Sequence, residues 1–281
     1  IIATCEVAFM LESFKEIIYE ICEEENIKYG EYSNGWIIEL VKVNTIRHIV
    51  GMRFPLNDYA TATILNEKYA TYSILKEYNI PIIDHKMFFN PNTRAGYISD
   101  FKNEVEICNY LKNQSNGSII IKANSGSCGT EVYKCVSIDE IYGNLNKLFA
   151  SNDSVSICPF YDIKCEYRLV YLENECKLIF GKVAPKNGWK HNLAQGAEII
   201  EVTDKELIND LKNIADKVVK VLNCKFVSID IAQLKDDNLL VMEVNASVSI
   251  IKYSAFSDSN LKLAKEIYRQ AILKSFDVEN N

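Results

Sequence analysis

The chain has 281 residues, of which 48% are hydrophobic and 25% are charged, and its formal net charge is -7. This composition is typical of a soluble globular protein with two or three packed lobes, and no apolar run approaches the roughly 20 residues that span a bilayer. The negative charge and the dispersed lysines and arginines argue against nucleic acid as a partner. We therefore expect a cytoplasmic protein with no nucleic-acid or membrane partner.

The first 60 residues predict a small N-terminal lobe. Residues 6–25 place apolar side chains at helical spacing and predict an amphipathic helix. Residues 36–40 and 46–50 predict two short strands. A second helix is expected from about Asp58 to Tyr78, where Asn79 and Pro81 end it.

The remaining chain predicts two α+β lobes, over residues 61–157 and 158–281. In the first lobe we expect strands at 82–83, 118–123, 131–136 and 155–158 and helices at 100–111 and 138–149. In the second we expect strands at 167–172, 177–183, 226–233 and 239–245 and helices at 204–222 and 258–275.

The last two predicted strands carry the most informative pattern. If Asp236 and Asp237 form a two-residue turn, Asp230 lies directly across from Glu243. Because side chains alternate between the faces of a strand, Asn245 shares their face, and the opposite face holds Ile229, Ile231, Met242 and Val244. Two carboxylates and an amide oxygen suit Mg²⁺, with Mn²⁺ as an alternative ion. The competing interpretation is a solvated face of an antiparallel hairpin.

A second pattern joins a buried strand to a loop of small residues. The strand ends near Lys122, and the loop contains Ser125, Gly126, Ser127 and Gly129. Backbone N–H groups of such a loop can approach phosphate oxygens while the lysine supplies a positive charge. The spacing is not that of a Walker loop and no helix follows, so a simple β-turn is the alternative.

Two further segments offer groups to a nucleotide. The segment from Cys158 to Phe160 ends a strand at the expected junction of the lobes, where extended backbone would meet a purine edge. A strand containing Lys182 leads to a loop with Lys190, His191 and Asn192, whose cations and amides suit a transferring phosphoryl group. We expect His191 to be a surface residue rather than a general base.

Taken in order, these elements resemble the ATP-grasp superfamily, especially its glutathione-synthetase-like amino-acid and peptide ligases. The resemblance covers about residues 60–255 and implies a fold in which two α+β lobes clasp ATP. It implies that Lys68 and Lys122 contact the nucleotide and that the loop from Ser125 to Gly129 covers its phosphates. It also implies an adenine-binding hinge at Cys158 and Phe160 and a ribose contact near Asp162.

The resemblance assigns the remaining polar residues as well. The groups around the γ-phosphate and the acyl-phosphate correspond here to Arg168, Lys182, Lys190 and Asn192. The Mg²⁺ ligands correspond to Asp230, Glu243 and Asn245. The chain departs from the family pattern at three places, which are Glu67 in place of the usual Asp, Lys190 in place of the commoner Arg, and Ala246–Ser249 in place of Pro-Gly.

The leading prediction is an ADP-forming ligase that joins a carboxylate to an amine through an acyl-phosphate. Its expected substrates are small-molecule or peptide carboxylates and amines, and a homodimer is one of the oligomeric states left open. One alternative is an ATP-grasp enzyme that modifies a precursor peptide. Another is a non-catalytic nucleotide-binding protein. The sequence does not name the carboxylate or the amine.

Overall fold

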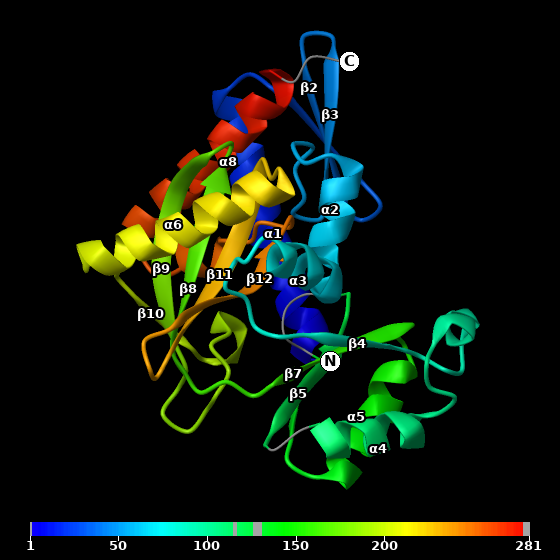
Figure 1. Ribbon diagram of the computed structural model, residues 1–281. Coiled ribbons are helices and arrows are strands. Elements are labelled where there is room, and N and C mark those ends of the chain that lie inside the picture. The colour runs from blue at the N-terminus through cyan, green and yellow to red at the C-terminus, as the bar shows by residue number, and fades with distance from the viewer. Residues whose placement is uncertain (1, 115–116, 126–130, 278–281) are drawn as a thin grey trace.

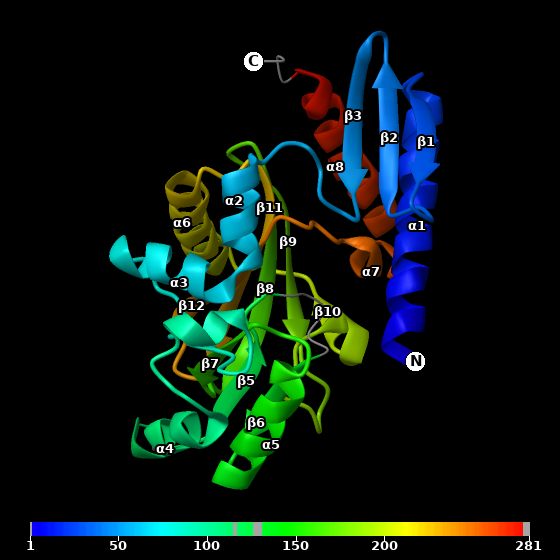
Figure 2. The ribbon, with the colours of Figure 1, turned by 90° about the vertical axis from the view of Figure 1, so that its right-hand side faces the viewer.

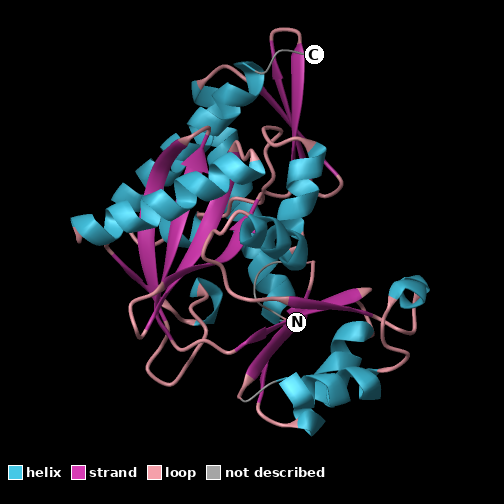
Figure 3. Cartoon of the chain, in the orientation of Figure 1, coloured by secondary structure: helices cyan, strands magenta, loops and turns pink. Residues whose placement is uncertain are grey.

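The computed structural model describes residues 2–114, 117–125 and 131–277, which form three sheets with antiparallel strand pairs (Figures 1 and 3). The first sheet contains β1 (Lys28–Tyr32), β2 (Ile37–Lys42) and β3 (Thr45–Val50). The second has the order β4 (Lys86–Phe89), β7 (Ser154–Pro159), β5 (Ile119–Ala123) and β6 (Val132–Cys135). The third has the order β10 (Glu198–Ile200), β9 (Glu175–Val183), β8 (Ile163–Leu172), β11 (Phe226–Leu234) and β12 (Leu239–Asn245).

Helices pack against all three sheets. The long helices α1 (Ile2–Glu24) and α8 (Asp258–Asp277) lie together beside the three-stranded sheet (Figure 2). The other helices are α2 (Tyr59–Asn66), α3 (Lys68–Glu77), α4 (Glu104–Gln114), α5 (Ile138–Phe149), α6 (Lys205–Leu222) and α7 (Ile251–Ser254), with short 3-10 turns at η1 (Arg94–Ile98) and η2 (Leu193–Gln195). None of the described helices is long and apolar enough to cross a membrane. The α+β class predicted from the sequence is confirmed.

The five-stranded sheet is buried on both faces over much of its length. On one face Val170, Leu172 and Phe226 pack in a core with α1, α8 and the three-stranded sheet. On the other face Leu169 and Tyr171 pack against α6 and the α2–α3 segment. Burial on both sides explains why the end of β8 is continuously apolar rather than alternating. The N-terminal elements thus share a core with the far end of the chain, and the lobe boundaries at 60 and 157 stay predictions.

The helix expected from Asp58 to Tyr78 is in fact two helices. Glu67 has an extended backbone, with φ -113° and ψ 116°, and forms a β-bridge with Ser125. The next residue, Lys68, donates its backbone N–H to the carbonyl of Asn124 at 3.0 Å. The expectation of one helix was wrong because tertiary pairing with the loop after β5 outweighs local helix propensity.

The hairpin of β11 and β12 has the predicted register at the site but a different turn. Leu234 donates to the carbonyl of Asn238 at 2.9 Å, so the loop has one residue more than the two-residue turn expected. A β-bulge between the Asp230 and Ile231 pairs then shifts the register back, and Asp230 lies opposite Glu243 as predicted. The bulge also changes the side on which Met242 lies, because its side chain lines the cavity instead of facing away from it as expected.

Candidate functional site

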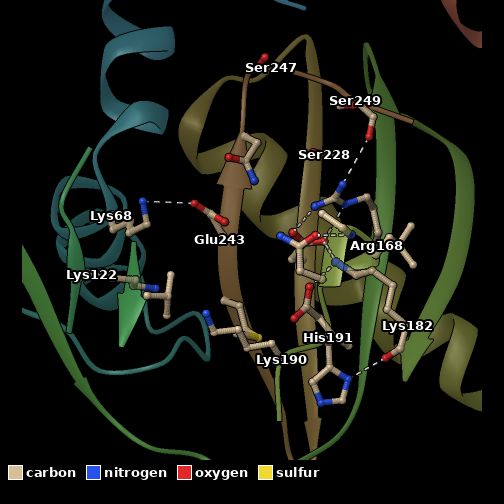
Figure 4. Close-up of a pocket in the computed structure, with 18 of the residues that line it drawn as sticks. Lys68, Lys122, Arg168, Lys182, Lys190, His191, Ser228, Glu243, Ser247 and Ser249 are labelled. Atoms are coloured by element: carbon tan, nitrogen blue, oxygen red, sulfur yellow. Dashed lines mark hydrogen bonds and ion pairs between the residues drawn. The ribbon is translucent and has the colours of Figure 1, made fainter. Parts of the chain in front are cut away.

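The candidate site is a cavity of about 430 Å³ lined by the four-stranded and five-stranded sheets together with α3 and the loop after β9. It brings together most of the residues predicted from the sequence (Figure 4). Those that line it are Lys68, Lys122, Ser125, Cys158, Phe160, Arg168, Lys182, Lys190, Asn192, Asp230, Glu243 and Asn245.

Four predicted residues are not placed in the cavity. Gly126, Ser127 and Gly129 lie outside the described residues. Asp162, expected near a ribose, does not line the cavity, because its exposed carboxylate pairs with Lys235 at 2.6 Å at the outer end of the hairpin.

The centre of the site is a buried carboxylate held by two cations. Asp230 lies directly across from Arg168 on β8, and the guanidinium binds both of its oxygens, with Nε–Oδ1 at 2.8 Å and Nη2–Oδ2 at 2.6 Å. Lys182 Nζ lies 3.1 Å from the same Oδ1 and also pairs with Glu166. Burial alone would raise the pKa of Asp230, but the two cations outweigh burial and hold this pKa below its usual range.

A second carboxylate lies beside it on β12. Glu243 is the cross-strand neighbour of Asp230, and its Oε1 lies 3.5 Å from Lys68 Nζ. Asn245 is two residues further along the strand, opposite Ser228, and its side chain also lines the cavity. The sheet therefore sets these groups in register across adjacent strands.

Two lysines reach the cavity from the opposite side. Lys122 is the penultimate residue of β5, and Lys68 begins α3, which is docked onto the loop after β5 by hydrogen bonds from two backbone N–H groups to Asn124. Burial lowers the pKa of Lys68, the nearby Lys122 lowers it further, and Glu243 opposes the shift. Two desolvated ammonium groups this close favour an anion between them.

The loop after β9 contributes side chains to the cavity. Burial lowers the pKa of Lys190, whose Nζ lies 5.4 Å from the centre of the Trp189 ring. Asn192 lines the cavity and also caps η2, because its Oδ1 accepts the backbone N–H of Ala194 at 2.8 Å. Its side-chain oxygen is therefore committed to the loop.

The expectation that His191 is a surface residue was wrong. Its side chain is buried, and Nδ1 lies 2.9 Å from the carbonyl oxygen of Lys182. Since a carbonyl only accepts, Nδ1 carries the proton and the ring pins this loop to β9. A histidine in a polar loop carries no sequence signal for such a tertiary contact.

One end of the cavity is apolar. Ile83, Ile120 and Cys158 form a small core there, against which Phe160 and Trp189 pack. The two aromatic rings meet edge to face at 5.8 Å. Apolar walls beside exposed strand ends are suited to a purine base.

Comparison with known proteins identifies the fold family. Residues 85–270, more than half of the chain, match the RimK-like ATP-grasp domain. The chain belongs to the RimK-like ATP-grasp family. The alpha-aminoadipate–LysW ligase LysX of Saccharolobus solfataricus is 29% identical over 199 residues, which cover 68% of this chain and 64% of that protein. An uncharacterised protein of Mycoplasma genitalium is 26% identical over 162 residues, covering 55% of this chain and 52% of that protein. The chain thus matches between half and two thirds of the length of these relatives.

Solved structures share the fold of this chain. D-alanyl-alanine synthetase A from Vibrio cholerae has a TM-score of 0.67 and 13% identity, covering 96% of this chain and 94% of that one. D-alanine–D-alanine ligase from Bacillus anthracis, solved in complex with ATP, has a TM-score of 0.56 and 18% identity, covering 78% and 70%. At these identities the likeness concerns the fold, and the ATP-grasp fold predicted from the sequence is confirmed.

The donor set on β12 fits the Mg²⁺ that an ATP-grasp fold implies. Asp230 already accepts three charged N–H groups, so the more open donors are the carboxylate of Glu243, whose side chain is 29% exposed, and the amide of Asn245. Among the described residues no cluster of three or more His, Cys, Asp or Glu side chains could hold a metal ion. A hard cation here would complete its oxygen shell with water and phosphate.

Several lining residues of this RimK-like site escaped the sequence analysis. Glu166 pairs with Lys182, and strand alternation could have found it because it lies two residues before Arg168 on β8. Ser228 could have been found in the same way, since it lies two residues before Asp230. Trp189 has no local pattern and enters the cavity only through the path of its loop.

Proposed function

We propose that the chain is an ADP-forming ligase that joins a carboxylate to an amine through an acyl-phosphate. The observation that carries this proposal is the charge of the cavity. Among the described lining residues six are cationic (Lys68, Lys122, Arg168, Lys182, Lys190 and Lys252) and four are acidic (Glu131, Glu166, Asp230 and Glu243), although the whole chain has a net charge of -7. Positive charge focused in a partly desolvated cleft suits a polyphosphate.

The proposed reaction has two steps. A carboxylate oxygen of the substrate attacks the γ-phosphorus of ATP, the bond to the bridging oxygen breaks, and ADP leaves. The amine then attacks the acyl carbon, phosphate leaves with the electrons of the C–O bond, and the nitrogen loses a proton to give the amide. This route needs no nucleophilic side chain, because the phosphoryl group supplies the leaving group.

We assign roles to the residues of the site by their positions in the cavity. Lys68 and Lys122 would hold phosphate oxygens from the side of the four-stranded sheet, and Lys182 and Lys190 would do so from the other side. Mg²⁺ bound with ATP would add positive charge at Glu243 and Asn245. The buried Arg168–Asp230 pair would keep the strands and their charges in register.

Calorimetric titration of Mg-ATP tests the nucleotide site. The wild-type protein should bind, and Glu243→Gln should lose roughly tenfold or more in affinity, because even the partners of metal ligands commonly contribute that much. Asp236→Asn, in the exposed turn of the same hairpin, is the matched control and should bind like the wild type. Absence of Mg-ATP binding to the wild type would sink the proposal.

Turnover separates the proposal from its alternatives. Hydroxylamine serves as a general amine, so an acyl-phosphate would be captured as a hydroxamate while ADP is released. Carboxylate-dependent hydroxamate formation supports a ligase. Activity only with peptide carboxylates favours the peptide-modifying alternative, and Mg-ATP binding without ADP release favours a non-catalytic nucleotide-binding protein.

A further inference from the structure

The cavity continues beyond the charged centre into a region built by the N-terminal elements and the segment after β12. Arg168 Nη1 lies 3.4 Å from the carbonyl oxygen of Ser249, and the backbone N–H of Val248 donates to the carbonyl of Met52 at 3.2 Å. These contacts connect the charged centre to the turn that follows β3. Figure 4 shows Ser247 and Ser249 at the end of the pocket opposite Lys190.

This region is lined mainly by large apolar side chains. From the N-terminal elements it receives Met10, Leu11, Trp36 and Met52, and from the C-terminal half Phe180, Leu193, Ile250 and Tyr253. Phe180 and Tyr253 stack with ring centres 4.8 Å apart. Among the described lining residues of 10–52 and 247–253, none is acidic, and Lys252 is the cationic one.

Trp36 is held at the wall by a specific backbone feature. Gly51 has a left-handed backbone, with φ 60°, and donates its N–H to the carbonyl of Trp36 at 2.8 Å. A Cβ at position 51 would come within 2.8 Å of the indole ring, so only glycine lets the ring lie against this turn. Trp36 is nevertheless 53% exposed, which leaves apolar surface for a ligand.

We propose that the carboxylate substrate is an acid with a large aliphatic or aromatic side chain, which binds against Trp36 and Met52 while its carboxylate meets the nucleotide near Arg168. This inference rests on the proposed ligase function. A second carboxylate on the substrate would be desolvated among apolar groups with few partners. Methionine side chains at positions 10 and 52 would adapt to different apolar shapes, so the wall selects a class rather than one compound.

The test compares carboxylic acids in the hydroxamate assay. Leucine, methionine and phenylalanine represent the apolar class, with alanine as the small acid and glutamate and 2-aminoadipate as the acidic ones. The apolar acids should exceed the others in kcat/KM by roughly tenfold or more, the range that buried methylene groups supply. Trp36→Ala should remove most of this difference by raising KM, without changing the affinity for Mg-ATP.

Tyr32→Ala is the matched control, because Tyr32 is also 53% exposed in the three-stranded sheet but does not line the cavity. This variant should keep the wild-type preference. As a second probe, Met52→Arg should shift the preference toward glutamate, since it places a cation on the same wall. Its backbone carbonyl, which accepts from Val248, is unaffected by the substitution.

A binding measurement keeps the inference testable without turnover. Trp36 and Trp189 are the two tryptophans of the chain, so Trp189→Phe leaves the fluorescence of Trp36 as the signal. With a non-hydrolysable ATP analogue present, leucine should change this fluorescence at lower concentration than glutamate. Preference for acidic acids, or an unchanged preference in Trp36→Ala, overturns the inference while the ligase stands. Absence of Mg-ATP binding or of ADP release in the wild-type protein overturns the ligase itself.

Discussion

Replacing Asp230 by asparagine should destabilise the fold strongly, apart from any effect on activity. The Asp230 side chain is only 5% exposed and accepts three charged N–H groups from Arg168 and Lys182. After the substitution Lys182 keeps Glu166, whereas Arg168 keeps the carbonyl of Ser249 at 3.4 Å and at most a hydrogen bond to the uncharged amide oxygen at position 230. The guanidinium, whose side chain is 21% exposed, therefore loses its paired carboxylate, and removing one partner of a buried pair typically costs about 3–5 kcal/mol.

Urea denaturation at pH 7 without nucleotide measures this loss, with linear extrapolation of the free energy of unfolding. Asp237→Asn is the control, because Asp237 pairs with Lys164 at 2.8 Å while 66% of its side chain is exposed. Such a surface pair should contribute at most about 1 kcal/mol. Adding Arg168→Met to Asp230→Asn should recover part of the loss, because the unpaired cation is then removed as well.

A loss in Asp230→Asn no larger than that in Asp237→Asn would refute this reasoning. It would mean that water reaches Arg168 in the folded protein and replaces the carboxylate. If Asp230→Asn loses the expected free energy of unfolding but the double variant recovers none of it, the loss comes from packing rather than from charge.

Three further substitutions test other parts of the fold. Burial and two nearby lysines lower the pKa of His85 from 6.5 to about 2. Because the unfolded chain then binds a proton that the folded protein does not, the free energy of unfolding should fall by up to about 1.4 kcal/mol per pH unit below 6.5. His85→Gln should flatten this slope in urea titrations from pH 7 to 5. Gly51→Ala should lower the free energy of unfolding by about 1–2 kcal/mol because of the positive φ, and it should also displace the Trp36 ring. Gly117→Ala, with open space around it, should lower it less. Asp204→Ala removes the side-chain cap of α6 and should cost about 1 kcal/mol; an unchanged urea midpoint would contradict that role.

The paired carboxylates were predictable because strand alternation is a strong local rule. Asp230 and Glu243 were placed opposite each other, and the structure pairs them. The prediction succeeded through two compensating errors, since a longer turn shifts the register one way and the bulge shifts it back. Strict alternation placed Met242 on the face away from the cavity. This prediction was wrong because of the missed bulge, and Met242 lines the cavity.

Features that depend on distant segments were not predictable from local pattern. Glu67 sits in a sequence with helical spacing, and only its pairing with Ser125 breaks the helix. The strand β1, over residues 28–32, was missed because its tyrosines, glutamate and glycine do not alternate between apolar and polar. Its register comes from β2, which packs Ile38 and Leu40 into the core.

One face of the five-stranded sheet explains why the charged groups are so well ordered. Phe226 on β11 is part of the core under α1 and α8, and Asp230, four residues later on the same face, lies in the cavity. On β8, Val170 and Arg168 repeat this change from apolar to charged over two residues. The apolar half of each strand is held in the core, so the charged half is fixed in position. The charged groups therefore do not depend on a loop that must first become ordered.

This arrangement has a consequence for nucleotide binding. Lys68 pairs with Glu243, and Lys182 pairs with Asp230 and Glu166. Under the proposed function, phosphate oxygens would take the place of these carboxylates as partners of the lysines, and Glu243 would turn to Mg²⁺. Binding would then exchange one set of ion pairs for another on rigid strands, and little side-chain entropy would be lost on arrival of ATP.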